Sequence, residues 1–295
     1  MKPVIAITAG DPSGIGPEIA RKAADDPRVL EICEPRIYGP PKGASFAPGV
    51  LSAGAGRAAY DAICAAVRDA VEDRVAAIAT APINKLGFSR AGLHWKGHTD
   101  LLAELTHSRR VAMMFWSEPL KVVLATVHVP LADVPRLLTR DVLGDTIDLT
   151  AEELPRFGIE RPRLALAGLN PHAGEEGLLG REEQDVLRPA VEAARARGVS
   201  IEGPFPGDTI FGRAARGEFD AVIACYHDQG LIPVKLLAFG RAVNVTLGLP
   251  IVRTSVDHGT AFDIAGKGVA DPSSMIEAVV LAARLAKPQG QRSAP

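Results

Sequence analysis

Five histidines stand at the ends of apolar segments or beside glycines: His98, His128, His172, His227 and His258. In open α/β sheets, ligands bind beyond the carboxyl ends of the strands, and the apolar run 219–225 leads directly into Tyr226-His227-Asp228-Gln229-Gly230. Three neutral imidazoles with one open position form a recognised divalent-metal site that polarises a hydroxyl or carbonyl oxygen. The spacings are too long to be a signature, so a shared site for three of these histidines is a hypothesis. A lone histidine after a strand is more often a structural residue.

Three further side chains follow His227 on consecutive segments. Lys235 and Arg253 could clamp a phosphate or carboxylate, with Asn244 between them in the chain. The alternative is ordinary surface charge at strand ends.

Two more loops end strands with polar residues. Gly10-Asp11-Pro12-Ser13-Gly14-Ile15-Gly16 leads into a helix that begins at Pro17-Glu18, and such a loop can cradle a phosphate on its free amides. It fits neither the P-loop nor the dinucleotide fingerprint, so a plain tight turn explains it equally well. Asn84-Lys85 follows the next strand, and Gly97-His98-Thr99-Asp100 begins a helix. Thr99 and Asp100 suit helix capping, whereas His98 beside free amides suits an anion.

Strand and helix patterns alternate along the whole chain, which predicts an α/β fold with a largely parallel sheet. The expected strands are 3–8, 36–38, 74–80, 111–115, 121–127, 163–167, 219–225, 243–247 and 251–254. The expected helices are 17–25, 56–73, one beginning near 97, 143–157, 182–197, 207–215 and 273–285, with Pro189 kinking the fifth or marking its real start. Any two-domain split is expected to be discontinuous.

Composition bounds the function. The chain has 295 residues, of which 47% are hydrophobic and 23% charged, and its net charge is −2, which predicts a soluble globular protein with no nucleic-acid or membrane partner. No signal peptide or membrane-spanning run is evident. Three widely spaced cysteines argue against a disulfide framework and favour the cytoplasm. The tail 287–295 is expected to be disordered.

Five motifs in order resemble the 4-hydroxythreonine-4-phosphate dehydrogenase family of vitamin B6 (pyridoxal phosphate) biosynthesis. They are Gly10-Asp11-Pro12-Ser13-Gly14-Ile15-Gly16-Pro17-Glu18, Gly97-His98-Thr99, Leu169-Asn170-Pro171-His172-Ala173-Gly174-Glu175, Tyr226-His227-Asp228-Gln229-Gly230 and Ser255-Val256-Asp257-His258-Gly259-Thr260. The likeness runs from the first strand to the last helix. It implies the fold of the isocitrate and isopropylmalate dehydrogenases, with two α/β/α domains and a cleft between them. The expected division is residues 1–125 plus 255–295 against 126–254, the second domain carrying most metal and substrate residues.

The resemblance also implies an activity. It is the NAD- or NADP-dependent, divalent-metal-dependent oxidation of 4-phosphohydroxy-L-threonine to 2-amino-3-oxo-4-phosphooxybutanoate, which loses carbon dioxide to give 3-amino-2-oxopropyl phosphate. Zinc, cobalt, magnesium, manganese and nickel all remain open as the metal. A homodimer is implied, with the metal site at its interface.

The roles that the resemblance carries over fall on residues of this sequence. The metal ligands are His128, His172 and His227, and the substrate contacts are His98, Thr99, Lys235, Asn244 and Arg253. The catalytic candidates are Asp228 and Lys235, with the general base unassigned, and the cofactor-binding candidates are Gly14, Gly16 and Asn84.

Two alternatives stay open. Relatives in this family oxidise D-threonate or D-erythronate 4-phosphate, and a more distant branch oxidises aromatic cis-dihydrodiol dicarboxylates. A non-catalytic module that binds a phosphorylated acid is the alternative outside the enzymes. The chain is also shorter than typical members, with the shortening expected around residues 37–56.

Overall fold

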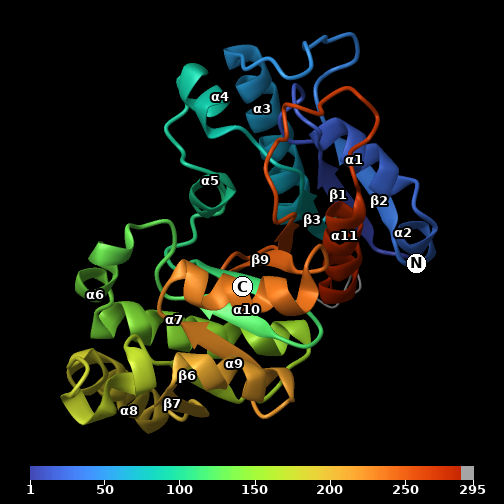
Figure 1. The fold of residues 1–295 in the computed structure, drawn as a ribbon. Coiled ribbons are helices and arrows are strands. Elements are labelled where there is room, and N and C mark those ends of the chain that lie inside the picture. The colour runs from blue at the N-terminus through green and yellow to red at the C-terminus, as the bar shows by residue number, and fades with distance from the viewer. Residues whose placement is uncertain (287–295) are drawn as a thin grey trace. The chain divides into compact units, whose positions relative to one another are not determined.

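The computed structural model describes residues 1–286, so the expected disordered tail lies outside the described residues. The chain divides into two compact units. Unit 1 is Met1–Arg109 together with the chain from Val243 onward, and unit 2 is Arg110–Ala242. Figure 1 shows the blue beginning and the red end of the chain running through unit 1. Compared with the expected division, residues 110–125 lie in the second unit and residues 243–254 in the first.

Unit 1 is a mostly parallel sheet with helices packed on it. Its strands are β1 (Val4–Thr8), β2 (Glu34–Tyr38), β3 (Ala77–Thr80), β9 (Val243–Leu247) and β10 (Arg253–Ser255), in the spatial order β2-β1-β3-β10-β9. Its helices are α1 (Gly16–Ala24), α2 (Pro27–Ile32), α3 (Ala53–Val71), α4 (Lys85–Arg90), α5 (His98–Leu105) and α11 (Ser273–Leu285). Only β9 runs antiparallel to its neighbour in this sheet. The carboxyl ends of β1, β3 and β10 therefore share one edge of the sheet.

Unit 2 has the same general plan. Its strands are β4 (Ala112–Trp116), β5 (Lys121–Leu124), β6 (Leu164–Ala167), β7 (Ile201–Phe205) and β8 (Ala221–Ala224), in the order β4-β5-β8-β6-β7. Its helical segments are η1 (Leu131–Asp133), α6 (Val134–Leu137), α7 (Arg140–Glu153), η2 (Leu154–Phe157), η3 (Pro171–Gly177), η4 (Glu183–Leu187), α8 (Arg188–Ala196), α9 (Gly207–Ala215) and α10 (His227–Ala238). The β4–β5 pair is the expected antiparallel hairpin, and the other pairs are parallel.

The central strands β6 and β8 are apolar throughout and fully buried, because both faces of the sheet are covered there. Alternate residues such as Val122, Val222 and Ala165 pack in one cluster with α9 and α10. The residues between them, such as Val123 and Ile223, have no exposed surface and face the other side of the sheet, where α7 and α8 contact the strands. Burial on both faces gives continuous apolar runs rather than alternating ones.

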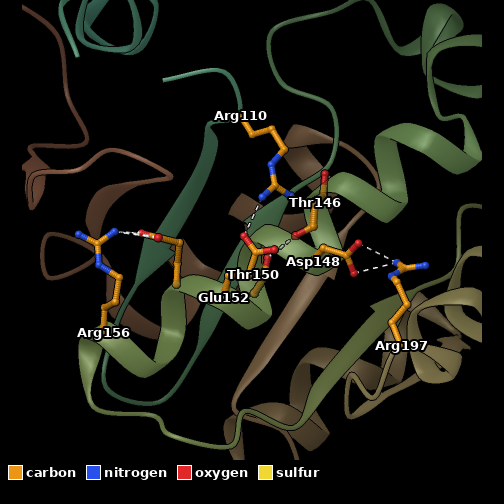
Figure 2. Close-up of polar contacts among 8 residues, drawn as sticks. Arg110, Thr146, Asp148, Thr150, Glu152, Arg156 and Arg197 are labelled. Atoms are coloured by element: carbon orange, nitrogen blue, oxygen red, sulfur yellow. Dashed lines mark hydrogen bonds and ion pairs between the residues drawn. The ribbon is translucent and has the colours of Figure 1, made fainter. Parts of the chain in front are cut away.

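Side-chain contacts fix α7 within unit 2, as Figure 2 shows. The Arg110 guanidinium binds Glu152 at 2.7 Å, and Arg197 binds both oxygens of Asp148 at 2.8 Å. Near the carboxyl end of α7, the half-buried Arg156 pairs with Glu153, which is only 9% exposed. These contacts join α7 to the linker before β4 and to the end of α8.

The observed elements confirm most of the expected ones, and several others, among them α2, α4, β7 and α10, were not expected. Residues 227–238 form α10, where no helix was expected, although Pro233 lies inside it and removes one amide donor. Packing of its buried residues, including Leu231 and Val234, against β5 and β8 stabilises the helix despite that loss. Pro189 lies in the first turn of α8, which begins at Arg188 and follows the single π-helical turn η4 without a break. No helix in the described part of the chain has the length and apolarity needed to cross a membrane.

Candidate active site

Arg253 is a buried cation without a counter-charge. It is 2% exposed on β10, and its guanidinium donates to the hydroxyl of Thr80 at 2.7 and 3.2 Å and to that of Thr246 at 2.9 Å. Within residues 1–286, no carboxylate forms an ion pair with it. Burial lowers the pKa of this guanidinium to about 9. A desolvated cation held only by hydroxyls is a ready partner for a phosphate or carboxylate.

Two other predicted substrate residues in unit 1 carry buried polar atoms without a partner. Nε2 of His98 and Oδ1 of Asn244 are enclosed and make no hydrogen bond within the described residues. Burial, followed by the nearby charge of Arg253, lowers the pKa of His98 well below its usual value, so the ring is neutral. Asn244 pairs with Ser255 in the register of β9 and β10. Thr99 follows His98 in the first turn of α5. The charge of Arg253 acts on His98, and the gathering of His98, Thr99, Asn244 and Arg253 into one substrate site stays a prediction.

The predicted cofactor residues are held by contacts within the protein. A Cβ on Gly14 would lie 2.7 Å from the carbonyl oxygen of Thr260, and one on Gly16 would lie 2.1 Å from that of Ala9. The amide of Ile15 also donates to Thr260 O at 3.0 Å. Asn84 caps α4, since its Oδ1 accepts a hydrogen bond from the Gly87 amide at 3.0 Å. These contacts account for the residue types, and their assignment to cofactor binding stays a prediction.

Two of the predicted metal ligands lie close together in unit 2. The rings of His128 and His227 are 5.4 Å apart between centroids. His227 begins α10, and its Nδ1 lies 2.7 Å from Oδ1 of Asp228. A carboxylate on Nδ1 leaves Nε2 as the nitrogen with a free lone pair, which is how metal-binding imidazoles are commonly oriented. The donor types and this orientation fit a divalent metal.

His172 lies in an unusual backbone segment. Residues 172–176, within η3, all have positive φ, from 41° to 80°, and only Gly174 among them is a glycine. For the four other residues the left-handed conformation costs about 4–8 kcal/mol in total. Residues 1–286 hold no group of three or more His, Cys, Asp or Glu side chains arranged to hold a metal ion. The structure thus brings two of the three predicted ligands together.

A pocket of about 740 Å³ in unit 2 joins several of the motifs. Its wall includes residues 168–172, the beginning of α9, Tyr226 and the exposed side of α10. Lys235 lies on α10, eight residues after His227, rather than on a strand-linked segment as expected. Gln229 connects the two motif loops, because its amide donates to Gly168 O at 2.6 Å and its Oε1 accepts from the Cys225 amide at 2.7 Å.

Sequence reasoning did not select Thr80, Thr246 or Gln229. Thr80 ends β3 at the carboxyl edge of the sheet, which is a usable signal, whereas Thr246 lies in mid-strand. Gln229 is part of a motif, but one of its two backbone partners, Gly168, lies 61 residues away in the sequence, so the bond that joins the two loops could not be predicted.

Comparison with known proteins identifies the family. Residues 12–282 match the family model "Pyridoxal phosphate biosynthetic protein PdxA". The chain is 46% identical to 4-hydroxythreonine-4-phosphate dehydrogenase from Desulforapulum autotrophicum, covering 96% of this chain and 95% of the relative. It is also 46% identical to a putative D-threonate 4-phosphate dehydrogenase from Bradyrhizobium diazoefficiens, covering 96% of each.

Comparison with solved structures supports the same family. The crystal structure of 4-hydroxythreonine-4-phosphate dehydrogenase from Klebsiella pneumoniae superposes with a TM-score of 0.89 at 40% identity, covering 97% of this chain and 98% of that one. A β-decarboxylating dehydrogenase from Thermococcus kodakarensis shares the fold alone, with a TM-score of 0.54 at 16% identity over 94% of this chain and 81% of the other. The expected α/β fold is confirmed, and the chain belongs to the PdxA family of pyridoxal phosphate biosynthetic proteins.

Proposed function

We propose that this chain oxidises 4-phosphohydroxy-L-threonine at its secondary alcohol, giving 2-amino-3-oxo-4-phosphooxybutanoate, which then loses carbon dioxide to form 3-amino-2-oxopropyl phosphate. The observation that carries the proposal is Arg253, a buried guanidinium whose partners among the described residues are hydroxyls only. Such a cation favours an anionic substrate, and relatives named for this phosphorylated substrate support the same choice.

In this proposal, one set of residues binds the substrate and another set binds the metal. His98, Thr99, Lys235, Asn244 and Arg253 bind the phosphate and carboxylate and orient the alcohol. A neutral His98 can accept or donate one hydrogen bond at Nε2 without repelling Arg253. His128, His172 and His227 would hold the metal, with Asp228 orienting His227 through Nδ1. When bound, the metal supplies Lewis acidity and the nicotinamide accepts the hydride.

The cofactor is NAD or NADP, and the metal is zinc, cobalt, magnesium, manganese or nickel. Gly14, Gly16 and Asn84 are proposed to border the nicotinamide cofactor. We also propose a homodimer with the metal site at its interface. The apolar side chains exposed on and just after α10 support it: Ile232 is 59% exposed, Leu236 80% and Phe239 81%. Three unpaired cysteines support a cytoplasmic location.

A second candidate has specific support. A relative named a putative D-threonate 4-phosphate dehydrogenase is 46% identical to the chain, as is a relative named for the amino acid substrate. Two further relatives named D-threonate 4-phosphate dehydrogenase are 43% and 42% identical. D-Threonate and D-erythronate 4-phosphate place a hydroxyl where the first substrate has an amino group, and Arg253 and Lys235 serve either compound.

A substrate panel tests the proposal. Dialysed protein is given each 4-phosphate with NAD or NADP, with and without one divalent metal, and the absorbance of the reduced nicotinamide is followed. Metal-dependent turnover of 4-phosphohydroxy-L-threonine supports the proposal, and preference for D-threonate or D-erythronate 4-phosphate moves the chain to the second candidate. Metal binding with no turnover on any of them would contradict both and favour the non-catalytic module.

A further inference from the structure

Glu183 is a buried carboxylate that forms no ion pair within residues 1–286. It is 1% exposed and begins the π-helical turn η4. Both of its oxygens are bound by a single residue, Asn170. The Asn170 amide donates to Oε1 at 2.7 Å, and its side-chain Nδ2 donates to Oε2 at 2.9 Å. Burying a charge in this way is costly, so the arrangement calls for a reason beyond packing.

The two bonds to Glu183, together with a bond from Asn170 Nδ2 to Glu182 Oε2 at 2.7 Å, hold the residue that precedes the left-handed segment carrying His172. Asn170 is the residue before η3, and the Ala173 amide donates back to Asn170 O at 3.1 Å. The carboxylate also fills the space inside the segment, because a Cβ on Gly174 would lie 2.6 Å from Glu183 Oε2. Glycine at 174 is therefore required both by its φ of 80° and by this close approach.

The next residue of η4 holds the other end of the segment. Gln184 donates from Nε2 to Glu176 O at 2.6 Å, so consecutive side chains of η4 bracket residues 170–176. Arg140 in turn donates twice to Asp185 O, at 2.9 and 2.7 Å, and so ties the π-helical turn to α7. Single π-helical turns inside helices occur frequently at functional sites. Without such contacts the left-handed conformation of His172 would not persist.

We infer that Glu183 is a positioning residue: acting through Asn170, it holds the left-handed turn and thereby sets where the His172 imidazole is displayed. The inference rests on the proposed function only in taking His172 as a metal ligand. Its hold on the backbone is independent of any metal. Groups that orient metal ligands typically contribute a factor of about 10–100 to metal affinity.

The test uses Glu183→Gln, which keeps one acceptor for the Asn170 amide, and Glu183→Leu, which keeps none. Glu153→Gln is the matched control, since Glu153 is also buried in unit 2 but pairs with Arg156. Hydrogen exchange of peptides covering residues 170–179 is measured on the metal-free proteins. Cobalt affinity is measured by chelator competition and by the visible absorption of bound Co²⁺.

Glu183→Gln is expected to speed exchange in residues 170–179 and to weaken cobalt binding about 10-fold. Glu183→Leu is expected to speed exchange more, and to weaken cobalt binding more, than Glu183→Gln does. Glu153→Gln is expected to show the exchange rate and the cobalt affinity of the wild type. If Glu183→Leu fails to fold, Glu183→Gln alone decides. Unchanged exchange in the Gln variant overturns the inference, and so does faster exchange with unchanged cobalt affinity. A wild-type protein that binds no cobalt would contradict the proposed metal site, while the exchange comparison would still decide the role of Glu183.

Discussion

Replacing Arg253 by Met should separate the stability of the empty protein from its ability to bind an anion. Burial lowers the pKa of Arg253 from its ordinary value to about 9, and at about 1.4 kcal/mol per pKa unit the charged form therefore costs about 5 kcal/mol in the folded state. Because the folded-state pKa of this cation is lowered, its charge destabilises the folded protein fully below about pH 9. The destabilisation decreases as the pH rises above about 9 toward the pKa of the unfolded state. Removing the charge removes that cost.

The substitution also loses the hydrogen bonds to Thr80 and Thr246, each contributing about 1.5–3 kcal/mol because the donor is charged. The two effects are of similar size, so the unfolding free energy of Arg253→Met without ligand should lie within about 2 kcal/mol of wild type, as for other buried charges replaced by apolar residues. Saturating phosphorylated hydroxy acid, at about 100 times its dissociation constant, should stabilise the wild type by about 2.7 kcal/mol.

Thermal unfolding with and without 4-phosphohydroxy-L-threonine measures both effects. The wild type should gain several degrees on addition of the ligand, and Arg253→Met should gain almost nothing while folding normally. Arg253→Lys is the matched control, because it keeps the charge but loses the forked geometry. An Arg253→Met protein that keeps the full ligand-induced shift would refute the reading of Arg253 as the anion-binding group. A loss of more than about 5 kcal/mol in the empty protein would refute the estimate of the charge cost.

Two further predictions concern unit 1 and the packing of helices. Since the pKa of His98 is lowered from 6.5, unfolding takes up a proton as pH falls below 6.5, and stability that is complete above that pH should decline by up to about 1.4 kcal/mol per pH unit. His98→Asn should flatten this decline in urea unfolding between pH 7 and 5, whereas the same change at the exposed His107 should not. Gly56→Ala should destabilise the protein by about 1–3 kcal/mol, because the new Cβ would lie 2.3 Å from the carbonyl oxygen of Gly87. Gly144→Ala, also in a helix but with nothing within 4 Å, should instead stabilise it by about 0.5–1 kcal/mol, and equal effects of the two changes in chemical denaturation would contradict the close approach.

Much of the fold could be predicted because its signals are local. Continuous apolar runs predict strands buried on both faces, and β1, β6 and β8 lie within such runs. Proline marks the first turn of several helices, as Pro189 does in α8. The helix α10 was missed since Pro233 and a weak apolar pattern contradict a helix locally, and only its packing against β5 and β8 favours one.

The candidate site could be predicted only as residue types at strand ends. Local sequence patterns were enough to predict the α/β class, the motifs that identify the family, and the histidines, cations and glycines available for chemistry. Tertiary structure alone decided that Arg253 is buried against hydroxyls, that His128 lies beside His227, and that Asn170 meets Glu183. The physical reason is that burial, pKa shifts and left-handed backbone depend on contacts between residues distant in sequence, such as Arg253 and Thr80, and no local pattern encodes those contacts.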